Sequence, residues 1–216
     1  MRLCFLASGL RSLAVCTPAQ VLTSQYDNAR TGANVHETLL TPENVNTRQF
    51  GKLYSFPVDG DGYAQPLFMP NIEIAGKGKH NVVFVATEHD SVYAFDGNAV
   101  ITEPLWHVNF LDSARGIGTV PSTDVNCPFI LPEVGITSTP VIDTQSGTIY
   151  VLARTRERQG GTTSYVQKLH ALSIVDGTEK SGGPWKSMAR SAPKVIGSAA
   201  TLSSTLYERT SGPRCC

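Results

Sequence analysis

The chain has 216 residues; only 17% of them are charged, and 18 basic side chains balance 18 acidic ones. A neutral chain with so few charges gives no indication of nucleic acid or an anionic membrane surface as a partner. No run of about 18 apolar residues is present, so no transmembrane helix is predicted. The 19 glycines and 13 prolines are spread as expected for many turns between short strands, and no long helical periodicity appears.

Residues 1–19 are predicted to be a secretory signal. They combine an early arginine, Arg2, with a weakly apolar middle and small residues that end at Ala19, which is the pattern of a cleaved export signal. Arg11 shortens the apolar run, so a start that has lost part of the true signal is the alternative. In both cases we expect the protein to be exported, to the periplasm or out of the cell.

Residues 20–56 lead into the part of the chain with the clearest strand patterns. Tyr26–Gly32 is rich in turn formers, and Pro42 directly after Thr41 favours a single helical turn. Residues 51–56 alternate as a strand does. We therefore expect this part to end in an N-terminal strand segment.

The strongest pattern is a hairpin over residues 82–96. Residues 82–85 and 92–95 are β-branched and aromatic runs, and the polar residues 88–90 separate them. The connection is too short for a crossover, so the two arms must be antiparallel. An isolated hairpin is only marginally stable in water, so this one is expected to stack on others like it.

The same order of short motifs occurs twice, with connecting loops of different length. Self-similarity of this kind is the signature of a repeat architecture. Each copy supplies about four short strands, the content of one propeller blade. The sequence therefore predicts an all-β fold with little helix, a partial β-propeller of four-stranded antiparallel blades. The matching segments are 65–68 with 139–142, 82–87 with 148–155, and 93–96 with 170–173.

Several motifs in this order resemble those of the quinoprotein family, the β-propellers related to pyrroloquinoline-quinone (PQQ) dehydrogenases. They are SQYDNARTGAN, LTPENVNTRQFGKLYSF, YAQPLF, VFVATEHDSVYAFD and PLWHV, and the resemblance covers about residues 24–180. Blades of that family carry Ala-x-Asp followed by Gly and a docking tryptophan. Here Ala94-x-Asp96 is followed late, by Trp106, and Ala171-x-Ser173 lacks the Asp. The resemblance implies PQQ-repeat blades and, for a member that is an oxidoreductase, PQQ and calcium as cofactors.

Residues 20–180 are expected to form the propeller part, with about two recognisable repeats. The long connection 111–134 has no clear secondary structure and is expected to lie as an ordered excursion over one face, because residues 129–131 need burial. Residues 176–180 are expected to turn into a fourth strand. The pattern then fails, so residues 181–216 are predicted to be an irregular tail, truncated or read in a wrong frame. Closing a propeller takes at least about four blades, so the remaining blades are expected to be missing from this chain.

Three functions are compatible with these expectations. The first is an exported, non-catalytic PQQ-repeat-like propeller that binds a small-molecule ligand or a protein partner. The second is a fragment of a PQQ- and calcium-dependent alcohol or sugar dehydrogenase, which is the only enzyme class indicated. The third is a scaffold propeller in an outer-membrane assembly complex. Propellers host many functions, so the fold alone does not choose among them.

Candidate site residues are few. Gln65 and Thr139 hold matching places at the start of the innermost strands, which end at the central channel of a propeller. They are predicted to contact a cofactor or ligand, with packing between blades as the alternative. No catalytic residue and no metal site are indicated, because no cysteines or histidines stand at metal-ligand spacing. The polar residues 88–90 are expected to form a solvated turn, with cation binding or proton acceptance as the alternative.

Overall fold

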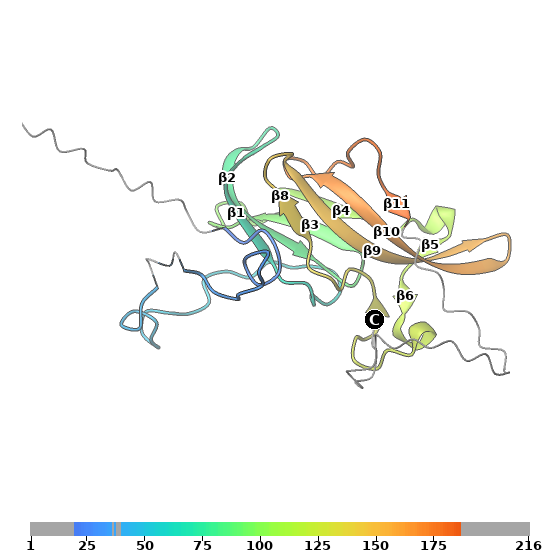
Figure 1. Ribbon diagram of the computed structural model, residues 1–216, viewed down its shortest axis with the longest axis horizontal. Coiled ribbons are helices and arrows are strands. Elements are labelled where there is room, and N and C mark those ends of the chain that lie inside the picture. Colours follow the sequence, from blue (N-terminus) through green and yellow to red (C-terminus); the bar gives the residue numbers. More distant parts are fainter. Residues whose placement is uncertain (1–19, 36, 38–39, 187–216) are drawn as a thin grey trace, which may run out of the picture.

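The structure, a computed structural model, describes residues 20–35, 37 and 40–186 and is built from antiparallel sheets (Figure 1). The predicted all-β class with little helix is confirmed, since helix in the described part is limited to two short 3₁₀ turns, η1 (Ser113–Arg115) and η2 (Ser122–Val125). The predicted signal and residues 187–216 of the predicted tail lie outside the described residues. No helix within the described part is long and apolar enough to cross a membrane.

The first sheet, sheet A, is a meander in which each strand pairs with the next along the chain. Its central hairpin pairs Val82 with Asp96 and Ala86 with Val92, so the predicted hairpin is confirmed. All residues of the third strand are buried, because other segments cover both faces of the sheet there. The strands are β1 (Leu67–Ile74), β2 (Gly78–Ala86), β3 (Ser91–Asp96) and β4 (Trp106–Asn109).

The second sheet, sheet B, repeats this meander with two longer strands. Its four successive strands pair as neighbours, and a short fifth strand pairs with the second of them near its C-terminal end. The expected turn at residues 176–180 leads into a fourth strand, which places Trp185 and Lys186 of the predicted tail against the strand before it. The strands are β8 (Val141–Asp143), β9 (Thr148–Gln159), β10 (Thr162–Ser173), β11 (Trp185–Lys186) and the added β5 (Ile117–Gly118).

The two sheets share one apolar core. In Figure 1 the teal and green strands of sheet A lie against the gold and orange strands of sheet B. Side chains alternate between the faces of a strand, so the residues in this core identify the contacting faces. Sheet A contributes residues such as Phe84 and Val92, and sheet B contributes Ile149, Val151 and Ala153. The even-numbered side chains of β9, starting with Tyr150, therefore point away from sheet A.

Trp106, the first residue of β4, anchors this packing. Its indole Nε1–H donates a hydrogen bond of 3.1 Å to the backbone oxygen of Ile174, which follows β10. The ring lies against the turn at Gly177, where a Cβ atom would come within 2.7 Å of it. Trp106, which follows the Ala-x-Asp motif at a longer spacing than the family pattern, is thus buried between sheet A and the turn after β10.

The connection over residues 111–134 is ordered, as expected, but buries little of its apolar centre. It contains η1, β5, η2 and a small separate pair of strands, β6 (Val120–Pro121) and β7 (Glu133–Val134). Ile130 packs with Cys127 in a second small core, whereas Phe129 is 64% exposed. The expectation that residues 129–131 are all buried is therefore wrong for Phe129 and its exposed neighbour Leu131.

The expected strand at residues 51–56 has no ladder partner in the described part of the chain. Its last residue, Phe56, nevertheless stacks on Phe95 of β3, with ring centroids 4.7 Å apart. Three residues later the Asp59 carboxylate accepts hydrogen bonds from the hydroxyls of Thr87 and Ser91, at 2.9 and 2.6 Å. This segment therefore covers the face of sheet A that points away from sheet B.

Candidate functional site

The connection between β2 and β3 carries two buried acids. Glu88 is 1% exposed and Asp90 is fully buried, so the expected solvated turn at residues 88–90 is wrong for both carboxylates. Burial follows from the packing of sheet A on sheet B, which brings the segment before β8 across the tip of this hairpin. Between the two acids, His89 lies at the rim, and its Nδ1 is 2.7 Å from a carboxylate oxygen of Glu133.

Glu88 joins the hairpin tip to the segment that enters sheet B. Its Oε2 accepts a hydrogen bond of 2.6 Å from the backbone N–H of Gly135 and one of 3.0 Å from the hydroxyl of Thr137. Its other oxygen, Oε1, is buried without a hydrogen-bond partner among the described residues. Burial raises the pKa of the Glu88 carboxyl above its usual range, against the effect of these hydrogen bonds.

Asp90 joins the same tip to β9. Its Oδ1 accepts a hydrogen bond of 3.2 Å from the backbone N–H of Arg154, and its Oδ2 is buried without a partner in the described part. Burial raises the pKa of Asp90 to about 8, and the nearby charges of Glu88 and Glu133 act in the same direction. Asp90 is therefore protonated at neutral pH.

Gly135 is required for this contact. A Cβ atom built on it would lie 2.2 Å from the backbone oxygen of Glu88 and 2.9 Å from Oδ1 of Asp90. Contacts this short do not occur between real atoms, so a larger residue would push the entering segment off the hairpin tip. Only glycine lets the backbone approach closely enough for Glu88 to reach its N–H.

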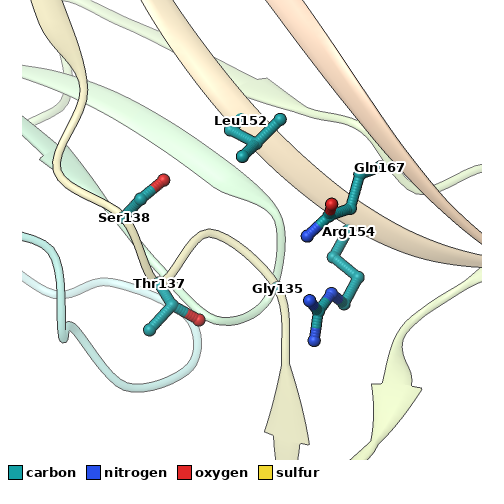
Figure 2. A pocket seen from close by; sticks show the side chains of 6 residues that line it. All are labelled: Gly135, Thr137, Ser138, Leu152, Arg154 and Gln167. Carbon is teal, nitrogen blue, oxygen red and sulfur yellow. The ribbon is translucent and has the colours of Figure 1, made fainter. Parts of the chain in front are cut away.

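A pocket of about 240 Å³ opens beside this junction (Figure 2). On one side it is lined by Leu152 and Arg154 of β9 and Gln167 of β10, and on the other by the loop from Gly135 to Ser138. The lining combines a guanidinium, an amide and two hydroxyl groups with one aliphatic side chain. Such a set can hold a small polar group through several hydrogen bonds.

Arg154 is the charged member of this pocket. Its side chain is half-buried, and its guanidinium forms no hydrogen bond or ion pair with the described residues. It lies close enough to Glu88 and Asp90 to lower the pKa of both carboxyls, although burial outweighs this effect. The sequence motifs do not single out this arginine, because its place beside the pocket depends on the register of β9.

Leu152 of the pocket also belongs to an apolar surface on the side of sheet B that points away from sheet A. Three residues of this surface are largely exposed: Val141 at 40%, Leu169 at 38% and Trp185 at 46%. Strand pairing places Tyr150 beside Val141, and Leu152 beside Leu169. We call this surface the outer face of sheet B, and define it by Val141, Tyr150, Leu152, Leu169 and Trp185.

The equivalent residues of sheet A are covered. Leu67 pairs with Phe84 in sheet A as Val141 pairs with Tyr150 in sheet B, and Ala86 pairs with Val92 as Leu152 pairs with Leu169. All four sheet A residues are at most 3% exposed, because they lie in the core shared with sheet B. These positions are thus buried in sheet A, whereas solvent reaches the matching positions of sheet B.

The two residues predicted to contact a cofactor or ligand are brought together, and they bind each other. The backbone N–H of Gln65 donates a hydrogen bond of 3.0 Å to the hydroxyl of Thr139. The side-chain oxygen of Gln65 accepts a hydrogen bond of 2.9 Å from the backbone N–H of Gln25. Neither residue lines the pocket, and their predicted ligand contact stays a prediction.

The residues present differ from what the cofactor pair of the quinoprotein family needs. That family holds its calcium ion with Glu, Asn and Asp side chains. Within the described residues, no group of three or more His, Cys, Asp or Glu side chains could hold a metal ion, and the pocket offers a single charged side chain. The described part of the chain therefore shows no cluster of these acidic ligands for the calcium ion.

Comparisons with known proteins add no relative: no family model, curated protein or solved structure matches this chain.

Proposed function

We propose that this chain is an exported protein-binding module, made of two PQQ-repeat-like blades of a β-propeller. Its binding surface is the outer face of sheet B. The partner presents an antiparallel sheet of the same kind, with an apolar face like that of Ile149, Val151 and Ala153, which already cover sheet A.

The repeated register supports the propeller part of this proposal. Two four-stranded meanders that pack face to face, with matching residues on their matching faces, are what successive blades require. The contact of Trp106 with Gly177 and Ile174 also supports it, because a tryptophan after the third strand docks on the neighbouring blade in the family that the motifs resemble.

The difference in exposure between matching residues is the observation that carries the binding function. Val92 is fully buried in sheet A, whereas Leu169 at the matching place of sheet B is 38% exposed. A continuous apolar sheet face that solvent reaches is a marker of an interaction site. Because sheet A shows what covers this set of positions, the expected occupant is another sheet and not a loop or a helix.

The experiment follows self-association of the purified full chain by sedimentation over a range of concentrations. With its partner absent, the exposed apolar outer faces of two copies should cover each other, so wild-type association should rise with concentration and Leu169→Glu should strongly weaken it. Leu53→Glu is the matched control, because Leu53 is 81% exposed and lies away from this face. A wild-type chain that stays monomeric, or equal effects of the two variants, would overturn the proposal.

A separate assay addresses the dehydrogenase alternative. PQQ and calcium are added to the purified chain, and reduction of a dye is followed with a panel of alcohols and sugars. The binding proposal predicts no dye reduction above the level of the cofactors alone. Dye reduction that needs both the protein and an alcohol or sugar would instead support an oxidoreductase.

A further inference from the structure

We infer that the pocket beside Arg154 receives a carboxylate side chain, an Asp or Glu of the sheet that covers the outer face of sheet B. This inference rests on the proposed function, since it names the chemistry of the partner at that surface. The apolar part of the face does not distinguish one apolar partner from another, whereas a charged group at its edge selects a partner with the opposite charge.

Arg154 holds a position in sheet B that an acid holds in sheet A. Leu152 matches Ala86 in sheet A, so Arg154 matches Glu88 two residues further along. Leu169 matches Val92 in the same way. Gln167, two residues before Leu169, therefore matches Asp90, two residues before Val92. At the junction of sheets A and B these positions hold two acids that accept hydrogen bonds, and on the outer face of sheet B they hold a guanidinium and an amide.

In sheet A, where these positions are covered, both side chains accept hydrogen bonds from the neighbouring sheet. Glu88 accepts hydrogen bonds from the backbone N–H of Gly135 and the hydroxyl of Thr137, and Asp90 accepts one from the backbone N–H of Arg154. The hairpin tip of one sheet thus binds the entering segment and second strand of the next. A guanidinium has donors and no acceptor, so at the outer face the partner must supply the acceptor.

Covering the Arg154 cation with a partner costs free energy unless the partner supplies an opposite charge. A docked sheet would remove water from Arg154, and a buried guanidinium is tolerated when it is paired with an opposite charge. A carboxylate satisfies it best, because two oxygens match the planar fork of the guanidinium. The hydroxyl of Ser138 and the amide of Gln167 line the same pocket and provide further donors, whereas the hydroxyl of Thr137 donates to Glu88.

The size and charge of the pocket agree with a side chain as the occupant. Its volume of about 240 Å³ lies below the range of about 300–1,000 Å³ that holds drug-sized ligands. Asp90, which accepts a hydrogen bond from the backbone N–H of Arg154, keeps its proton up to about pH 8. It therefore adds little negative charge that would compete with an incoming carboxylate at neutral pH.

The test uses two small probes that differ by one charge. N-acetylglutamate amide and its neutral counterpart, N-acetylglutamine amide, are titrated separately into the full chain at neutral pH. Binding is followed by NMR through the side-chain Nε–H signal of Arg154 and the backbone signals of Thr137 and Ser138. We expect the acid to shift these signals in a saturable manner, and the amide to leave them in place.

Two variants complete the test. Arg154→Gln should lose the response to the acid, whereas Arg158→Gln should keep it, because Arg158 is an exposed arginine of the same strand outside the pocket. The indole signal of Trp106 reports that each variant is folded. Equal shifts from both probes, no shift from the acid, or an unchanged response in Arg154→Gln would overturn the inference.

The outcomes separate this inference from the proposed function. A chain that associates through Leu169 and ignores the acid probe would refute the carboxylate site and leave the docking face intact. A chain that binds the acid probe through Arg154 and stays monomeric would refute the docking face and leave the carboxylate site. Dimers that depend on both residues would identify a second copy of the chain as a source of the acid.

Discussion

The backbone N–H of Gln65 and the hydroxyl of Thr139 form a hydrogen bond of 3.0 Å between two residues that are 74 positions apart in the sequence. The residues precede the first strands of sheets A and B, so the bond joins the segments that lead into these sheets. It matches the alternative role expected for this pair, packing between repeated units. The hydroxyl of Thr139 only accepts in this bond, so its own proton stays available for a ligand contact.

Thr139→Val should therefore lower the stability of the protein. The variant keeps the shape of the side chain but leaves the N–H of Gln65 without its acceptor, which costs roughly 1 kcal/mol in free energy of unfolding. Urea unfolding measures the change, and Thr163→Val, at an exposed position of β10, is the control. Equal stability of Thr139→Val and wild type would show that the bond contributes nothing to the packing.

Gly177→Ala should be destabilising for two reasons. Gly177 has φ of 74°, which costs an alanine about 1–2 kcal/mol, and the new Cβ would lie 2.7 Å from the ring of Trp106. The clash adds about 1–3 kcal/mol. Gly76→Ala isolates the backbone cost, because Gly76 has φ of 71° and open space around its Cβ position. If both variants lose the same stability, Trp106 does not pack on this turn.

Gly135→Ala tests the contact between the hairpin tip and the segment that leads into sheet B. Its Cβ would lie 2.2 Å from the backbone oxygen of Glu88, so the entering segment must move and the bonds to Glu88 are lost. We expect a loss of about 3 kcal/mol in free energy of unfolding. Gly118→Ala, which meets no atom within 4 Å, should be close to neutral.

Asp90 should make the protein less stable as the pH rises. Its pKa is about 8 in the folded chain and about 4 when unfolded. Between these values the folded state binds the extra proton, so the free energy of unfolding falls with increasing pH. The contribution is fully present below about pH 4 and is lost through pH 8. The groups that set this pKa besides burial are Glu88 and Glu133, which raise it, and Arg154, which lowers it.

Asp90→Asn should remove this part of the pH dependence. The amide stays neutral at every pH, keeps an oxygen for the N–H of Arg154, and tolerates the φ of 53° at this position. The variant should match wild type at about pH 4 and exceed its stability by a growing margin up to pH 9, as measured by urea unfolding at each pH. Glu103→Gln changes an exposed acid and serves as control. Parallel pH profiles of Asp90→Asn and wild type would contradict the assignment.

Local patterns in the sequence predicted the strands well where the strands pair with their neighbours. The hairpin over residues 82–96 has β-branched arms around a polar tip, and the matching hairpin of sheet B has the same order, so local residues determine both. The strand expected at residues 51–56 failed because a strand needs a partner, and the described part contains none for it. Alternation alone does not reveal whether a neighbouring strand exists.

The candidate site could not be predicted from these patterns. Glu88 and Asp90 look like residues of a solvated turn, and only the approach of Gly135 from a segment some 47 residues away buries them. Arg154 gains its role from strand register, which places it at the edge of an uncovered face. One sequence pattern does bear on Arg154, the match of residues 82–87 with residues 148–155. When this alignment is extended by one residue beyond residue 87, Glu88 is aligned with Arg154.

The account depends most on sheet A being covered by sheet B while the outer face of sheet B stays open. The two tryptophans report on these two surfaces, because Trp106 is 8% exposed and Trp185 is 46% exposed. The direct measurement is hydrogen exchange of the two indole N–H signals in the full chain, with Trp185→Phe to assign them. We predict that the indole N–H of Trp106 exchanges slowly and that the proton on Cε3 of the same ring shows a nuclear Overhauser contact to Gly177, whereas the indole N–H of Trp185 exchanges rapidly. Rapid exchange of both signals, with no contact between Trp106 and Gly177, would contradict the account.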